Sequence, residues 1–228
     1  MNIPISPRLL ACCDLVAPGS RIADIGCDHG YLSIWLLIHG IARSAIAADI
    51  NKQPLQTAVG NAEKYGVRDK MECYLSDGVA AIPRDFDTLI CAGVGADTMV
   101  SILEAAPWLQ NGSYKLILQC QSKTPMLRRY LSESGWRIAR ESVLRDGRFL
   151  YTVMALDREP AQPLTPGQWH VSPALLEKPT KETTEYYRRT LGKLRLAVAG
   201  RADPMDIAAL AELETLADNY TFLKEETP

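Results

Sequence analysis

The 228-residue sequence contains no run of about 18 apolar residues, and its start lacks a basic segment leading into an apolar one. A membrane-spanning helix needs about 20 predominantly apolar residues, and a secretory leader needs the second pattern. We therefore expect a cytoplasmic protein without a membrane partner. The composition, 47% hydrophobic and 23% charged, is typical of a chain that folds around a core.

Histidine is scarce, and the cysteines lack the spacing of a metal site. Three histidines are scattered along the chain, and no two of the six cysteines have C-x-x-C spacing. Zinc sites and disulfide frameworks usually show themselves as clustered ligands or regularly spaced cysteines. The sequence therefore predicts neither a metal site nor a disulfide framework. The six cysteines are Cys12, Cys13, Cys27, Cys73, Cys91 and Cys120.

A strand that ends in a glycine-containing loop is the most informative feature that the chain does have. Residues 21–30 read Arg-Ile-Ala-Asp-Ile-Gly-Cys-Asp-His-Gly, so Asp24, Gly26 and Gly30 form a D-x-G-x-x-x-G pattern. The pattern resembles the cofactor loop of S-adenosylmethionine (SAM) methyltransferases, where glycine lets the backbone approach the ligand and a helix N-terminus offers free N–H groups. Those enzymes usually carry a glycine where this chain has Asp28. The resemblance thus implies a carboxylate beside the cofactor.

Strands and helices alternate along the first 135 residues. This rhythm predicts a parallel sheet that binds its ligands at the carboxyl ends of the strands. The expected strands are 22–25, 42–48, 71–75, 86–91 and 115–119, and the expected helices are 5–16, 29–39, 51–65, one ending near 106, and 126–134.

Two further strand-like runs, 136–144 and 149–156, break this rhythm. They are joined through Asp146-Gly147, and Asp-Gly between two such runs is a strong hairpin signal. SAM methyltransferases end their sheet with an antiparallel hairpin, whereas dinucleotide dehydrogenases generally continue with further crossovers. We therefore expect an α/β fold, a class I SAM-methyltransferase Rossmann-like sheet with a terminal antiparallel hairpin.

The chain beyond residue 158 predicts a linker and a helical appendage. Five prolines mark 159–179 as a Pro-rich linker, and apolar residues at helical spacing predict helices over 180–199 and 204–223. The expected organisation is a methyltransferase domain over 1–158, the linker, and a C-terminal α-helical hairpin over 180–228.

The appendage is electrically polarised. Residues 177–201 carry seven Lys or Arg against three Asp or Glu, whereas 203–226 carry one against seven. The basic helix contacts RNA phosphates, or it pairs with its acidic neighbour; the sequence leaves both alternatives open. The candidate RNA-binding residues are Lys123, Arg128, Arg129, Arg188, Arg189, Lys193 and Arg195.

Acidic residues also follow the second and third expected strands. Asp49 lies 23 residues beyond Gly26, about where a carboxylate meets the ribose hydroxyls in an NAD or a SAM site. Asp77 follows the third strand, where it would lie near the adenine. A loop with a purely structural role is the alternative. The predicted cofactor-binding residues are Asp24, Gly26, Gly30, Asp49, Asn51, Asp77, Gly78 and Gly93.

Two cysteines lie where RNA cytosine-C5 methyltransferases keep their nucleophile and helper thiols, at the ends of the fourth and fifth strands. Cys91 lacks the proline that precedes that nucleophile, so we favour the alternative that Cys91 and Cys120 are small buried hydrophobes. The fourth strand also lacks the Asn/Asp-Pro-Pro-Tyr sequence that clamps an exocyclic amine. Methylation of an adenine or cytosine amino group is therefore disfavoured.

Taken together, five segments resemble the bacterial tRNA (adenine-22-N1)-methyltransferase family, TrmK, over about residues 5–157. The family usually reads A-G-M-G-G after the fourth strand and L-Q-P after the fifth, where this chain has Ala92-Gly93-Val94-Gly95-Ala96 and Gln119-Cys120. We expect Ala96 to add a methyl group near the substrate side. The five segments are 23–32, 49–51, 76–78, 92–95 and 116–119.

The resemblance implies SAM-dependent methylation of adenine N1 in tRNA, at position 22, and we expect Asp28 to be the catalytic residue and no metal to be bound. Adenine N1 has an in-plane lone pair, so it can attack a sulfonium methyl group without first losing a proton. The positive charge that develops would be stabilised by Asp28, whose alternative role is a helix N-cap. The other candidate functions are methylation of a small metabolite and non-catalytic binding of SAM or RNA. The sequence does not predict the oligomeric state.

Overall fold

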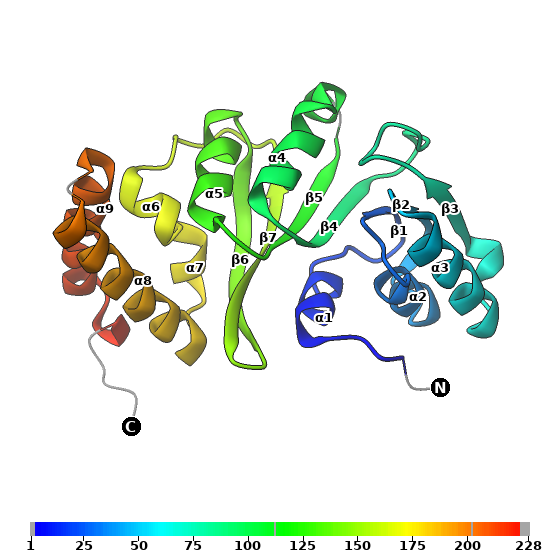
Figure 1. Ribbon diagram of the computed structural model, residues 1–228, viewed down its shortest axis with the longest axis horizontal. Helices are drawn as coiled ribbons and strands as arrows, with labels where there is room; N and C mark the ends of the chain where they lie inside the picture. Colours follow the sequence, from blue (N-terminus) through cyan, green and yellow to red (C-terminus); the bar gives the residue numbers. More distant parts are fainter. Residues whose placement is uncertain (1–2, 112, 202, 224–228) are drawn as a thin grey trace.

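The computed structural model describes residues 3–111, 113–201 and 203–223, so the outermost parts of the predicted domains 1–158 and 180–228 lie outside it. A seven-stranded sheet in the order β3-β2-β1-β4-β5-β7-β6 forms its centre (Figure 1). Pairing is parallel from β3 to β5, and β7 is antiparallel to both of its neighbours. The strands are β1 (Ser20–Ile25), β2 (Ala42–Asp49), β3 (Met71–Leu75), β4 (Thr88–Val94), β5 (Lys115–Cys120), β6 (Arg137–Asp146) and β7 (Phe149–Asp157).

Helices cover both faces of this sheet. One core lies under α4 and α5, and the other lies under α1, α2 and α3. Strands that are buried on both faces need apolar side chains in both directions, and this explains the nearly continuous apolar sequence of β4. The helices are α1 (Pro7–Cys13), α2 (Tyr31–Ile38), α3 (Lys52–Lys64), α4 (Ala96–Glu104), α5 (Thr124–Glu133), α6 (Pro166–His170), α7 (Pro173–Glu177), α8 (Lys181–Gly200) and α9 (Pro204–Asn219), with short 3-10 turns at 68–70, 107–111 and 221–223.

The expected class I methyltransferase fold is confirmed, with every expected strand within three residues of its predicted bounds. Several helices are shorter than predicted, and α9 spans Pro204–Asn219 rather than 204–223. The leading helix spans Pro7–Cys13 rather than 5–16, and α2 begins at Tyr31 rather than at residue 29. Gly30 has φ +73°, and this left-handed conformation keeps residues 29 and 30 out of the helix.

The segment 159–179, predicted as a linker, contains α6 and α7. Both helices have proline in their first turn, and α7 buries apolar side chains such as Leu175 and Leu176. The prolines therefore begin helices here, because a helix does not need the missing N–H at its first position. The domain boundaries themselves stay a prediction.

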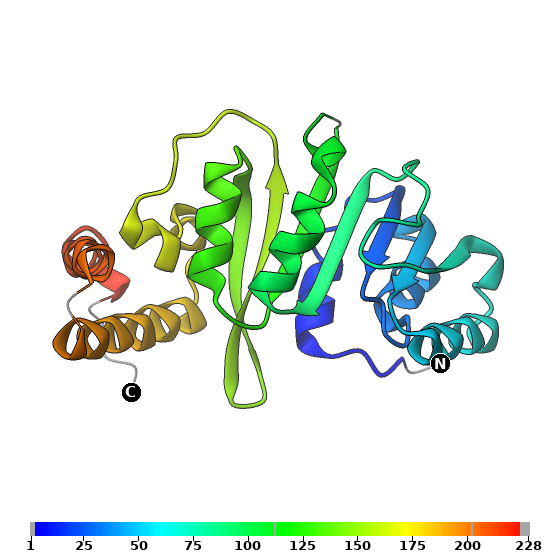
Figure 2. The ribbon, with the colours of Figure 1, turned by 45° about the horizontal axis from the view of Figure 1, so that its top comes forward.

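Helices α8 and α9 form the expected C-terminal pair, at one end of the elongated molecule (Figures 1 and 2). A third core joins them to α7 and to Val143 of β6. The Tyr187 hydroxyl of α8 donates to the Leu213 carbonyl of α9 at 2.7 Å, and Arg195 forms an ion pair with Glu214 at 2.9 Å. The basic helix therefore pairs with its acidic neighbour at one position at least, one of the two predicted alternatives.

A buried ion pair fixes the appendage to the sheet. The guanidinium of Arg128 (α5) and the carboxylate of Glu141 (β6) are 2.8 Å apart, and both side chains are fully buried. Arg128 also donates to the carbonyls of Trp169 and His170 in α6, and the Ser172 hydroxyl donates to Glu141. The two buried charges compensate each other, and hydrogen bonds occupy further donors and acceptors of both groups, as a buried ion pair requires. Arg128 was predicted to contact RNA, and this prediction is wrong because its side chain has no exposed surface.

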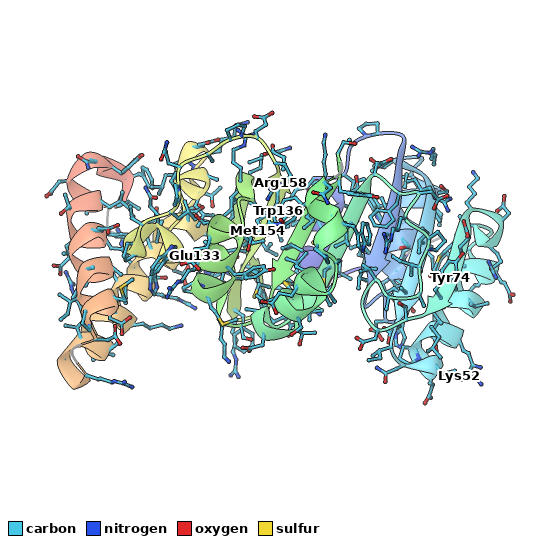
Figure 3. All side chains as sticks on the ribbon, turned by 90° about the horizontal axis from the view of Figure 1, so that it is seen from above. Lys52, Tyr74, Glu133, Trp136, Met154 and Arg158 are labelled. Atoms are coloured by element: carbon cyan, nitrogen blue, oxygen red, sulfur yellow. The ribbon has the colours of Figure 1, made fainter. Side chains whose placement is uncertain are left out.

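The amino edge of the sheet is closed by the chain that leaves β7. Arg158 lies beside Trp136 in the view from above, with its guanidinium 5.1 Å from the ring centroid (Figure 3). It also donates to the Ser134 carbonyl at 2.7 Å. These contacts direct residues 159–165 along the amino edge toward α6, so the opposite edge, where the parallel strands end, stays free of this crossing. None of the described helices is long and apolar enough to cross a membrane.

Candidate cofactor and substrate site

The loop between β1 and α2 leaves the carboxyl edge of the sheet through three left-handed residues. Gly26, Asp28 and Gly30 have φ values of +75°, +49° and +73°. The N–H groups of Gly26 and Cys27 both donate to the Ala48 carbonyl of β2 at 2.9 Å. A non-glycine residue at positive φ is strained, so Asp28 needs contacts that hold it there.

Asp49, at the end of β2, provides the contact that holds Asp28. One oxygen of its carboxylate accepts the N–H of Asp28 at 3.0 Å, and the other accepts the N–H of Asn51 at 2.8 Å. Two backbone N–H groups from different loops therefore converge on one nearly buried carboxylate. A carboxylate accepts up to about four hydrogen bonds, so Asp49 retains capacity for a ligand hydroxyl.

A cavity of about 250 Å³ opens above this loop. Four of the predicted site residues line it: Asp24, Gly26, Asp28 and Gly93. Arg8 and Leu9 of α1 close it from the side, and the sequence analysis assigned them no role. The remaining lining residues are Cys27, His29, Tyr31, Leu32, Ala92 and Val94.

Asp24 lies at the bottom of the cavity. Its carboxylate accepts a hydrogen bond from the Ser33 hydroxyl at 2.8 Å. Burial, with the nearby charge of Asp49 adding to it, raises the pKa of Asp24 to about 6, although the Ser33 hydrogen bond acts in the opposite direction. A buried carboxylate with a raised pKa is poised to meet a cation.

Asp28 stands at the mouth of the cavity with 73% of its side chain exposed. One carboxylate oxygen lies 3.5 Å from Nε2 of His29. The N-cap residue of α2 is Gly30, and the structure shows no side-chain hydrogen bond at this cap. The alternative role of Asp28 as a helix N-cap is therefore wrong, and its carboxylate is free to face a ligand.

The other predicted cofactor residues lie outside the cavity. Gly30 is buried below the loop, where an added Cβ would come within 2.9 Å of Met71 and 3.0 Å of Ala58, so glycine here permits close packing of the loop on α3. Asn51 and Asp77 are exposed at the carboxyl ends of β2 and β3. Gly78 follows Asp77 with φ +52°.

A hydrogen bond to a side chain of β5 holds the loop after β4. The N–H of Gly93 donates to the side-chain oxygen of Gln119 at 3.0 Å, and Gln119 in turn donates to the Cys120 carbonyl. Ala96 was expected to point toward the substrate, and this expectation is wrong. Its methyl group is fully buried in the core under α4, among residues such as Met99.

The cysteines at the ends of β4 and β5 do not reach the cavity. Cys91 and Cys120 are buried in the core. Burial raises the pKa of Cys91 to about 12, so the thiolate that a nucleophile needs is not formed at neutral pH. The alternative that they are small buried hydrophobes accounts for both residues.

A second cavity, of about 440 Å³, adjoins the first across the loops after β4 and β5. Gln121 belongs to its lining and donates its N–H to the carbonyl of Val94, which lines the first cavity. Lys123, His170, Tyr186 and Lys193 also line this second cavity. The appendage thus contributes α8 to a cavity whose lining is joined to that of the first by this backbone hydrogen bond.

Comparisons with known proteins agree with this geometry. A family model described as "Methyltransferase domain" matches residues 5–154. A Bacillus subtilis relative named tRNA (adenine(22)-N(1))-methyltransferase is 29% identical over 157 residues, which are 68% of this chain and 66% of the relative. A Mycoplasma pneumoniae relative, grouped by name with the tRNA methyltransferases, is 32% identical over 74% of this chain and 79% of its own length.

This chain belongs to the TrmK family. The crystal structure of Streptococcus pneumoniae Sp1610 in complex with S-adenosyl-L-methionine has a TM-score of 0.82 and 27% identity, and the match covers 93% of this chain and 99% of that one. The match includes the helical appendage as well as the sheet. The chain spans about two thirds of the length of the curated B. subtilis relative.

The residues of this TrmK-family site fit SAM. The methionine part of SAM carries an ammonium, a sulfonium and a carboxylate, and the cavity offers the carboxylates of Asp24 and Asp28 together with the guanidinium of Arg8. Gly26 and Gly93 leave the backbone open to the ligand at two points of the lining. Asp24 therefore has a chemical reason to be buried, since a bound cation would compensate its charge.

SAM binding by this protein should weaken in acid. The raised pKa of Asp24, about 6, means that the free protein takes up a proton below pH 6, whereas the cations of SAM favour the charged carboxylate. Affinity should then fall by up to about tenfold per pH unit below 6. Calorimetry with wild-type protein and Asp24→Asn between pH 5 and 8 measures this. A variant with the wild-type pH dependence would contradict the role of Asp24.

Proposed function

We propose that this protein transfers the methyl group of SAM to N1 of adenine in tRNA, at nucleotide 22, in the cytoplasm. The carboxylate of Asp28, held at the mouth of the cofactor cavity by a strained backbone, is the observation that carries the proposal. The name of the B. subtilis relative supports the choice of nucleotide. The match between this chain and the SAM complex of Sp1610 supports the choice of cofactor.

The proposed chemistry needs no base to activate the nucleophile. When bound, SAM supplies an electrophilic methyl group. Adenine N1 attacks with a lone pair, and the ring gains positive charge as the new bond forms. A carboxylate placed beside the ring stabilises this charge, and it can also accept a hydrogen bond from the adjacent amino group. Asp28 is exposed, so it can meet the base, and it lines the cofactor cavity. It is therefore placed both to stabilise the charge and to accept the hydrogen bond.

We infer the remaining roles from position along the carboxyl edge. Asp24, Gly26 and Gly93 would surround the methionine part of SAM because they line the cavity. Asp49 would accept the ribose hydroxyls. Asp77 and Gly78, which follow β3, would lie near the adenine of SAM, with Gly30 and Asn51 supporting the two loops between them.

The target base must leave its stack to reach this site. Adenine N1 lies on the Watson–Crick edge, so a paired or stacked target is exposed first. The second cavity lies beside the cofactor loop and is lined by lysines from two elements, Lys193 on α8 and Lys123 before α5, of which Lys123 also pairs with Asp97 at 2.8 Å. Ammonium groups in this position suit the phosphates that flank an extruded nucleotide.

Mapping the methylated nucleotide tests the function directly. Unmodified tRNA incubated with the purified protein and SAM should gain one N1-methyladenine at position 22, which blocks reverse transcription there. A tRNA with guanine at position 22 is the matched control and should remain unmodified. Methylation of both tRNAs at another position, or of neither, would contradict the proposal.

The position of Lys193 leads to a prediction about RNA binding. Lys193→Gln should weaken tRNA binding and lower the salt slope of log Kd by roughly one, since one phosphate contact is lost. Arg195→Gln, two residues along α8, is the control because Arg195 already pairs with Glu214 at 2.9 Å. Filter binding at several salt concentrations measures both slopes. Equal slopes for wild type and Lys193→Gln would place the RNA elsewhere.

A further inference from the structure

Arg8 brings a cationic side chain from outside the sheet into the cofactor cavity. It is the second residue of α1, which packs against α2 and the far end of the sheet. Its side chain is 32% exposed, so most of the guanidinium and its stem lie inside the protein. The mechanism proposed above gives this residue no role.

The described residues satisfy only part of the hydrogen-bonding capacity of the Arg8 guanidinium. Nε of Arg8 is buried and has no hydrogen-bond partner among them. Nη1 lies 3.6 Å from a carboxylate oxygen of Asp146, at the tip of the β6–β7 hairpin, and the guanidinium lies 6.0 Å from the centroid of the Tyr151 ring. A distance of 3.6 Å is an ion pair but not a hydrogen bond. A buried N–H donor without an acceptor is costly, so the guanidinium, which lines the cavity, has hydrogen-bonding capacity left for a ligand.

The charges around the cavity indicate what kind of ligand this is. Asp24 and Asp28 present carboxylates, and Arg8 presents the permanent positive charge of the lining. A ligand with both cationic groups and one anionic group matches this arrangement. An α-amino acid moiety that also bears a sulfonium has this charge pattern, and a nucleic-acid phosphate beside two carboxylates does not.

We propose that Arg8 binds the α-carboxylate of the methionine part of SAM. The inference rests on SAM as the cofactor in the proposed function. A guanidinium recognises a planar carboxylate through two parallel N–H···O bonds, and this requires a free Nε or Nη edge such as the one Arg8 offers. Asp146 is a positioning residue, because its charge restrains Arg8 while leaving Nε unpaired.

The arrangement also connects the appendage to the cofactor cavity. Arg145, next to Asp146 in the hairpin, pairs with Glu185 of α8. The tip of the hairpin is therefore held between α8 on one side and α1 on the other, and Figure 2 shows it projecting beyond the carboxyl edge of the sheet. Arg8 thus receives its orientation from the same hairpin that α8 anchors.

A ligand that lacks only the α-carboxylate provides the sharpest test. Calorimetry compares SAM with decarboxylated SAM on the wild-type protein and on Arg8→Gln. Loss of a charge-assisted pair predicts that the variant binds SAM roughly 10- to 100-fold more weakly, while its affinity for decarboxylated SAM changes by less than about threefold. The wild-type protein should prefer SAM over decarboxylated SAM by a similar factor, and this comparison does not depend on the folding of a variant.

One control variant and the pattern of affinity losses separate the possible outcomes. Arg43→Gln removes an exposed arginine that pairs with Asp87 at 3.2 Å and should change neither affinity. Equal losses for the two ligands in Arg8→Gln, or equal affinities in the wild-type protein, would overturn the inference. Loss of tRNA affinity with unchanged SAM affinity would also overturn it, because Arg8 would then contact a phosphate. SAM binding that depends on Arg8 in a protein that methylates no tRNA would uphold the inference and refute the proposed function.

Discussion

The carboxylate of Asp49 is the contact on which the geometry of the site depends. By accepting the N–H groups of Asp28 and Asn51, it joins the loop after β1 to the loop after β2. Without this bridge, Asp28 would have no reason to stay at φ +49°, a conformation that costs about 1–3 kcal/mol for a residue with a side chain. The strained backbone places the Asp28 carboxylate at the cavity mouth. Asp49 therefore has two roles in this account: it positions Asp28 through a backbone hydrogen bond, and it can bind the ligand directly.

A second constraint holds the appendage beside this site. The Arg128–Glu141 pair lies at the meeting point of α5, β6 and α6, and the partners of Arg128 include backbone carbonyls that only a folded α6 can present. Removing either partner leaves an uncompensated buried charge, which typically costs about 3–5 kcal/mol. The appendage is therefore part of one folded unit with the sheet. Together with the third core and the Arg145–Glu185 pair, this ion pair helps to hold the appendage where α8 presents Lys193 to the second cavity.

The fold was predictable because each element has a local signal. Apolar runs, glycine stops and the Asp146-Gly147 turn predict the strand bounds to within three residues, and the order of the strands follows from the class of sheet. Side-chain direction was less predictable. Ala96 belongs to the first turn of α4, and whether its methyl group faces substrate or core depends on how α4 packs. Arg128 resembles any surface arginine of an amphipathic helix until Glu141 is brought against it from another element. Arg8 gave no signal, since its role depends on the packing of α1 beside a cavity built by residues 24–31 and 92–94.

The central claim is that the charge of Asp28 stabilises the adenine cation as it forms, and single-turnover methylation of unmodified tRNA tests it most directly. The account predicts that Asp28→Asn lowers the rate roughly a hundredfold or more, while the affinity for SAM measured by calorimetry changes little. Asp28→Gly should lose rate to a similar extent, because glycine suits the positive φ but lacks the carboxylate. A near-normal rate for Asp28→Asn, or a loss of rate matched by an equal loss of SAM affinity, would contradict the account.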